Sequence, residues 1–89
     1  MIETQFTIIN KLGLHARAAA KLASTAGAFS CTIRTGCNGK LVDAKSVMSL
    51  MLLAASQGTV LNFEFNGSDE NDAHAAVQTL IADRFGEDQ

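Results

Sequence analysis

The sequence predicts an α+β fold in which three helices cover one face of a four-stranded antiparallel sheet. Apolar residues alternate along four segments and recur at helical spacing along three others, in the order β-α-β-β-α-β-α. Each strand pattern is apolar on one side only, which favours an antiparallel sheet with one face toward the helices and the other toward water. The 89 residues contain no proline and no linker, so residues 1–89 are predicted to form a single domain.

The first half of the chain contains a strand, a helix and a hairpin. Alternation over residues 2–8 predicts the first strand, which a glycine-containing segment, Asn10–Leu14, interrupts. Apolar residues at helical spacing predict a helix over residues 16–26, and Gly27 is expected to end it in the left-handed conformation. The second strand is predicted from Phe29, Cys31 and Ile33, and the third from Lys40 to Val42, since Asn38-Gly39 favours a hairpin turn.

The second half repeats the alternation of helix and strand. Ser46 is a good N-cap for a helix from Val47 to about Ala55, ended by Gly58. Residues 61–65 alternate clearly and predict the last strand, and a turn over residues 66–68 follows. Ser68 or Asp69 is expected to cap the last helix. Its buried stripe is predicted to be Ala73, Ala76, Val77, Leu80 and Ile81.

Composition excludes several classes of protein. The net charge of −2 and the scattered basic residues imply no general affinity for nucleic acid. The N-terminus has no secretory signal pattern, and no apolar run is long enough to insert in a membrane. Cys31 and Cys37 form neither a disulfide framework nor a metal-binding spacing. We therefore expect a reduced, cytoplasmic protein that binds no metal and needs no cofactor.

His15 is the candidate functional residue, because it stands at or near the N-cap of the first predicted helix. Histidine is a poor N-cap, whereas a helix N-terminus with unpaired N–H groups and a positive dipole end is a good site for phosphate. A neutral imidazole nitrogen there can act as a nucleophile, and the N–H groups can stabilise a phosphoryl group that it has accepted. Arg17, in the first turn, can reach a phosphate oxygen, and Gly13 allows a sharp turn into the helix.

These residues alone leave other functions open. A histidine near a helix start is more often a plain surface residue, and Gly-x-His-x-Arg is a weak motif. The alternative is a small regulatory α+β module that binds an anionic ligand or a protein partner and is never phosphorylated. A nucleic-acid reader lacks the basic and aromatic residues it would need, and a hydrolase lacks paired carboxylates or a nucleophile–base pair near His15.

The segment Asn10-Lys11-Leu12-Gly13-Leu14-His15-Ala16-Arg17 resembles the active-site segment of the HPr family, the histidine phosphocarriers of the bacterial phosphotransferase system. The resemblance covers essentially the whole chain, including Lys45-Ser46 and Gln57-Gly58-Thr59. The Asn10–Gly13 opening and the Phe85–Asp88 ending also resemble NPr, the nitrogen-branch paralogue. The resemblance to the HPr family implies an HPr-like open-faced two-layer sandwich.

The resemblance also implies the roles of the site residues. His15 would become a phosphohistidine, through Nδ1, on a monomeric phosphoprotein that is a carrier and not an enzyme. Arg17 would stabilise the phosphoryl group, together with the backbone of Ala16 and Arg17. Enzyme I would donate the phosphoryl group and an enzyme IIA would receive it, for sugar transport or nitrogen regulation. Ala18 stands where the family usually has proline, which questions the stiffness of the turn but not the role.

The second predicted helix carries two further candidate sites. Ser46, besides capping the helix, is implied by the resemblance to be a regulatory phosphosite for an HPr kinase/phosphorylase. Leu50, Leu53 and Ala54 are expected to face the core. A second stripe remains that a thin two-layer domain cannot bury, and we interpret it as a partner-docking patch beside His15. That patch is Val47, Met48 and Met51.

Overall fold

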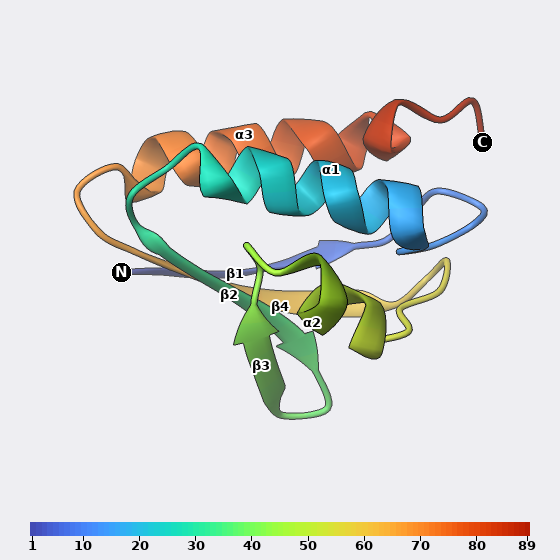
Figure 1. Ribbon diagram of the computed structural model, residues 1–89, viewed down its shortest axis with the longest axis horizontal. Helices are drawn as coiled ribbons and strands as arrows, with labels where there is room; N and C mark the ends of the chain where they lie inside the picture. The colour runs from blue at the N-terminus through green and yellow to red at the C-terminus, as the bar shows by residue number, and fades with distance from the viewer.

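The computed structural model describes residues 1–89 and contains the predicted elements in the predicted order (Figure 1). They are β1 (Ile2–Thr7), α1 (Ala16–Gly27), β2 (Thr32–Cys37), β3 (Lys40–Asp43), α2 (Val47–Leu52), β4 (Val60–Asn66) and α3 (Glu70–Ala82), followed by a short 3-10 turn, η1 (Arg84–Gly86). No helix in the chain is both long enough and apolar enough to cross a membrane.

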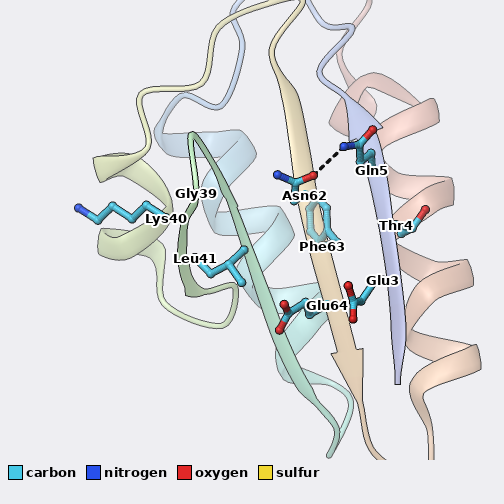
Figure 2. Close-up of a pocket in the computed structure, with 9 residues that line it drawn as sticks. All are labelled: Glu3, Thr4, Gln5, Gly39, Lys40, Leu41, Asn62, Phe63 and Glu64. Carbon is cyan, nitrogen blue, oxygen red and sulfur yellow. Dashed lines mark hydrogen bonds between the residues drawn. The ribbon is translucent and has the colours of Figure 1, made fainter.

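The sheet has the strand order β1-β4-β2-β3, and every neighbouring pair is antiparallel. In Figure 1, α1 and α3 run side by side over one face, and α2 packs against α1 and β3. The other face is polar. In the register of β1 and β4, Glu3 lies opposite Glu64 and Gln5 lies opposite Asn62. Figure 2 shows these residues lining a shallow hollow on the side away from the helices. The predicted antiparallel two-layer arrangement is confirmed.

The core is built mainly from alanine and aliphatic side chains, as a chain without tryptophan or tyrosine requires. Three phenylalanines, Phe63, Phe65 and Phe85, are its largest fully buried side chains. Phe63 and Phe65 come from the central strand β4, whereas Phe85 comes from η1, which the sequence pattern did not predict. The C-terminal turn is thereby anchored in the core.

The predicted start of the second strand is wrong, because β2 begins at Thr32 and Phe29 precedes it. The backbone N–H groups of Ser30 and Cys31 donate to the carboxylate of Asp69, at 2.8 and 2.9 Å. That carboxylate also explains why Asp69, although it holds the N-cap position of α3, makes no side-chain cap bond with its own helix. Its oxygens are used across the fold instead of locally.

Two predicted helix ends are also wrong. Gly27 lies inside α1, and the helix ends at Ala28 in a right-handed conformation. Helix α2 ends near Leu53 because Ala54 adopts a left-handed backbone (φ 51°), so Gly58 takes no part in its ending. As a result Leu50 is buried as expected, Leu53 is only half-buried, and Ala54 is exposed, not core.

Candidate functional site: a helix start beside the C-terminal tail

His15 occupies the N-cap position of α1, as predicted, with an extended backbone (φ −76°, ψ 179°). Its carbonyl accepts the first helical hydrogen bond, from the Ala19 N–H at 2.8 Å. Its imidazole makes no cap bond to its own helix, and about 29% of the side chain is exposed. The ring is therefore free for other chemistry while the backbone holds it at the helix start.

The first N–H groups of α1 are unpaired. Those of Ala16, Arg17 and Ala18 donate to no protein acceptor, and the first turn contains no acidic residue. The side chain of Arg17 is exposed and forms no ion pair or hydrogen bond within the protein. Unpaired helical N–H groups and a free guanidinium together suit a dianion such as a phosphoryl group.

Glu87, in the C-terminal tail, occupies one side of the His15 ring. Its Oε2 is hydrogen-bonded to Nε2 of His15, and its Oε1 accepts a bond of 3.0 Å from Nδ2 of Asn10. These partners lower the pKa of the Glu87 carboxyl, the His15 hydrogen bond most, against the opposing effect of burial. Nε2 is thus engaged, and Nδ1 is the ring nitrogen without a protein partner.

The tail that carries Glu87 is held at three points. Phe85 is buried in the core, its carbonyl accepts a 2.7 Å bond from Nζ of Lys21, and Lys11 N–H donates to the carbonyl of Gln89 at 3.1 Å. Arg84 and Phe85 both adopt left-handed backbones, which turn the chain back toward α1. In Figure 1 the C-terminus lies at the same end of the molecule as the start of α1.

The loop before His15 is fixed by the segment that follows α2. Gly13 has φ +69°, and a Cβ there would lie 2.6 Å from the carbonyl oxygen of Ala55, so the position requires glycine. The Leu14 N–H donates to that same carbonyl at 2.8 Å. Nε2 of Gln57 donates to the carbonyl of Ile9 at 3.1 Å. The site is therefore built from three segments distant in sequence.

Helix α2 presents the apolar surface that the sequence predicted. Val47, Met48 and Met51 are all exposed, Met48 by 79%. Two further apolar side chains, Leu52 and Leu12, are exposed by 78% and 68% and were not predicted. Ser46 caps the helix as expected, since its Oγ accepts a 3.3 Å bond from the Ser49 N–H.

Two other reactive side chains, Cys31 and His74, lie within the packing of the fold. Cys31 is buried, and burial raises the pKa of its thiol. The imidazole of His74 packs against the rings of Phe6 and Phe65, and each centroid-to-centroid distance is 5.5 Å. No group of three or more histidine, cysteine, aspartate or glutamate side chains is placed to hold a metal ion.

Glu87 and Asn10 are the site residues that the sequence reasoning missed. Glu87 is 72 positions from His15, so no spacing or periodicity connects them. The only signal was the resemblance of the Asn10–Gly13 and Phe85–Asp88 segments to the same paralogue, which did not say that the two segments meet. Side-chain contacts of this range depend on the complete fold.

A partly exposed imidazole beside unpaired helical N–H groups and an unpaired guanidinium is a site that suits a small anionic group. A family model described as "PTS HPr component phosphorylation site" matches residues 2–83. The phosphocarrier protein HPr of Cupriavidus necator is 52% identical over 87 residues, 98% of each chain, and that of Pseudomonas aeruginosa is 50% identical over 84 residues, 93% of each.

Solved structures give the same result. HPr-C-His from Thermoanaerobacter tengcongensis superposes with a TM-score of 0.95 at 44% identity over all of both chains. HPr from Bacillus anthracis superposes with a TM-score of 0.85 at 32% identity, over 90% of this chain and 95% of that one. The chain belongs to the HPr family. It is a phosphocarrier of the phosphotransferase system, its partners are components of that system, and it is not itself an enzyme.

Proposed function

We propose that Nδ1 of His15 accepts a phosphoryl group from enzyme I and passes it to an enzyme IIA in the cytoplasm. The observation that carries this proposal is the helix start itself, where an imidazole stands beside three unpaired N–H groups and a free arginine. The N–H groups of Ala16 and Arg17, with the Arg17 guanidinium, hold the phosphoryl oxygens. Positioning and charge stabilisation then supply most of the catalysis.

The transfer is a displacement between two imidazole nitrogens. The lone pair on Nδ1 of His15 attacks phosphorus, the bond from phosphorus to the donor nitrogen breaks, and that electron pair stays on the donor ring. The onward step reverses these roles, with His15 as the leaving group. Both steps need an accessible Nδ1, and His15 is partly exposed, with Nδ1 free of protein partners.

The carrier test uses purified protein, enzyme I and phosphoenolpyruvate. We expect the mass of one phosphoryl group to be added, in an acid-labile form, and to be absent in His15→Ala. His74→Ala is the matched control, because His74 is the only other histidine and lies between two phenylalanines. A wild-type protein that stays unmodified by the enzymes I of both the sugar and the nitrogen branch would instead support the non-phosphorylated regulatory module.

The same incubation separates the two branches. The resemblance to NPr stays a prediction, since the relatives reported above carry the name HPr. Faster phosphorylation by the nitrogen-branch enzyme I would assign the chain to nitrogen regulation. Faster phosphorylation by the sugar-branch enzyme would assign it to sugar transport.

The exposed side chains of α2 are proposed to dock both partners. Val47, Met48 and Met51 form an apolar patch on a helix that packs against α1, so a protein covering the patch would also reach His15. Met48→Asp should abolish transfer from enzyme I and leave the fold intact, because the side chain is 79% exposed. Ala75→Asp, which places the same charge on an exposed position of α3, is the control and should transfer normally.

Ser46 is proposed as a site for HPr kinase/phosphorylase. Its hydroxyl lies at the start of α2, where a phosphate is stabilised by the helix, and the added charge would weaken docking on the adjacent patch. Incubation with the kinase and ATP should modify the wild type and not Ser46→Ala. Modification that leaves transfer from enzyme I unchanged would remove the regulatory role.

A further inference from the structure

Glu87 contacts the one functional imidazole on the nitrogen that the transfer does not use. Its Oε2 bonds Nε2 of His15, and a carboxylate can only accept, so the shared proton belongs to Nε2. In a neutral imidazole one nitrogen carries the proton and the other has the free lone pair. The contact therefore leaves the lone pair on Nδ1.

Asn10 fixes the position of the Glu87 carboxylate. Its Nδ2 donates both to Oε1 of Glu87 and to the carbonyl of Gly13, at 3.0 and 2.8 Å. These two acceptors fix the orientation of the Asn10 amide, because a flipped amide would place its oxygen against the two acceptor oxygens. The cost of this arrangement is visible in Oδ1 of Asn10, which is buried and has no partner.

The charges around the contact favour an ionised Glu87. Lys21 lies on α1 with its Nζ bound to the carbonyl of Phe85, and it attracts the Glu87 carboxylate. The ring of His15 faces the same carboxylate from the head of α1. An ionised acceptor forms a stronger hydrogen bond than a neutral one.

Resting on the proposed function, we infer that Glu87 is a positioning residue for phosphoryl transfer, which holds the proton on Nε2 of His15 and so makes Nδ1 the nucleophile. When Nδ1 bonds phosphorus, both ring nitrogens are substituted and the ring becomes cationic. The Glu87 carboxylate then faces that positive charge through the Nε2 proton. Because this pairing keeps the proton on Nε2, the ring leaves as neutral imidazole in the onward step.

The test compares Glu87→Gln with Asp88→Asn, which removes one negative charge from the next, exposed position of the tail. The two ring nitrogens of His15 are observed by NMR in protein at a pH where the ring is neutral. We expect the wild type and Asp88→Asn to carry the proton on Nε2. In Glu87→Gln the amide can also donate, so a population with the proton on Nδ1 should appear.

Transfer from phosphorylated enzyme I is measured on the same three proteins. We expect Glu87→Gln to accept the phosphoryl group roughly tenfold more slowly, at the lower end of the loss found when a hydrogen-bonded partner of a functional histidine is removed. An unchanged tautomer or an unchanged transfer rate in Glu87→Gln overturns the inference. A wild type that accepts no phosphoryl group overturns the proposed function instead, and the NMR measurement still reports on the Glu87 contact.

Discussion

Helices α1 and α3 begin at opposite ends of the molecule and treat their positive ends in opposite ways (Figure 1). The first turn of α3 carries two acids, Glu70 and Asp72, and Glu70 also pairs with the N-terminal ammonium at 3.1 Å. The first turn of α1 carries no acid, and its N-cap side chain is an imidazole. One helix end is neutralised by the protein, and the other is left for an anion.

This difference shows why a helix start alone does not identify a site. Both starts have unpaired N–H groups, and neither N-cap side chain bonds its own helix. Asp69 uses its carboxylate on the backbone of Ser30 and Cys31, which joins α3 to the entry of β2. His15 keeps Nδ1 without a protein partner. The functional end is the one whose N-cap side chain is fixed through one atom, Nε2, and keeps another, Nδ1, free to react.

Both helix starts are reached through a glycine, and replacing either should have the largest effect on stability. Gly13→Ala places a methyl group 2.6 Å from the Ala55 carbonyl oxygen at a left-handed φ, and Gly67→Ala places one 2.6 Å from Cβ of Cys31. We expect each change to cost about 3 kcal/mol of the free energy of unfolding, from backbone strain plus overlap. Chemical denaturation measures both, and Gly39→Ala, which meets nothing within 4 Å, separates overlap from strain.

Arg17→Ala should affect only the open helix end. The side chain has no partner in the protein, so the melting temperature should not change, whereas loss of one charged donor should slow phosphoryl transfer roughly 100-fold. Arg34→Ala is the control, because Arg34 pairs with Glu64 on the opposite face of the sheet, at 3.1 Å. Equal transfer rates for the two variants would remove Arg17 from the site.

Asp69→Asn should affect only the closed helix end. The carboxylate accepts from the N–H groups of Ser30 and Cys31 and from Oγ of Ser30, and an amide replaces one of its oxygens with a donor. We expect the Tm to fall by several degrees and the transfer rate per folded molecule to stay at the wild-type value. A slower transfer in folded Asp69→Asn would show that the two ends are coupled.

Acid should weaken the two ends together. Hydrogen bonds from Ser30 lower the pKa of Asp69, and the bond to His15 lowers that of Glu87. A carboxyl whose pKa is lower in the folded state adds stability above its unfolded pKa, about 4, and loses it as the pH falls through the folded value. Thermal melts from pH 7 to pH 3 should therefore show falling stability below about pH 4. The fall should be shallower in Asp69→Asn.

The parts of the fold that local chemistry determines were predictable. Asn38 and Gly39 both adopt positive φ, at 57° and 79°, as the hairpin signal predicts, and Ser46 caps α2 through its own hydroxyl. The late start of β2 was not predictable, since Asp69 is 39 residues from Ser30. At the site, the helix pattern made His15 and Arg17 candidates, and the family resemblance implied their roles. The contact of Glu87 with His15 could not be predicted, because it depends on where the fold places the C-terminal tail.

The smallest expected effect is that of Ala18→Pro, which tests whether the third unpaired N–H at the start of α1 contacts the phosphoryl group. Ala18→Pro restores the residue usual in the family and removes one of these groups, and the Ala18 N–H has no protein acceptor to lose. Proline also restricts the unfolded chain, so we expect a stability change within about 1 kcal/mol at this buried position. If the phosphoryl group is held by the N–H groups of Ala16 and Arg17, transfer should be unchanged within roughly twofold. A large loss of transfer in a folded Ala18→Pro protein would place the third N–H in the phosphate site and would mean that this chain holds the group differently from proline-containing relatives.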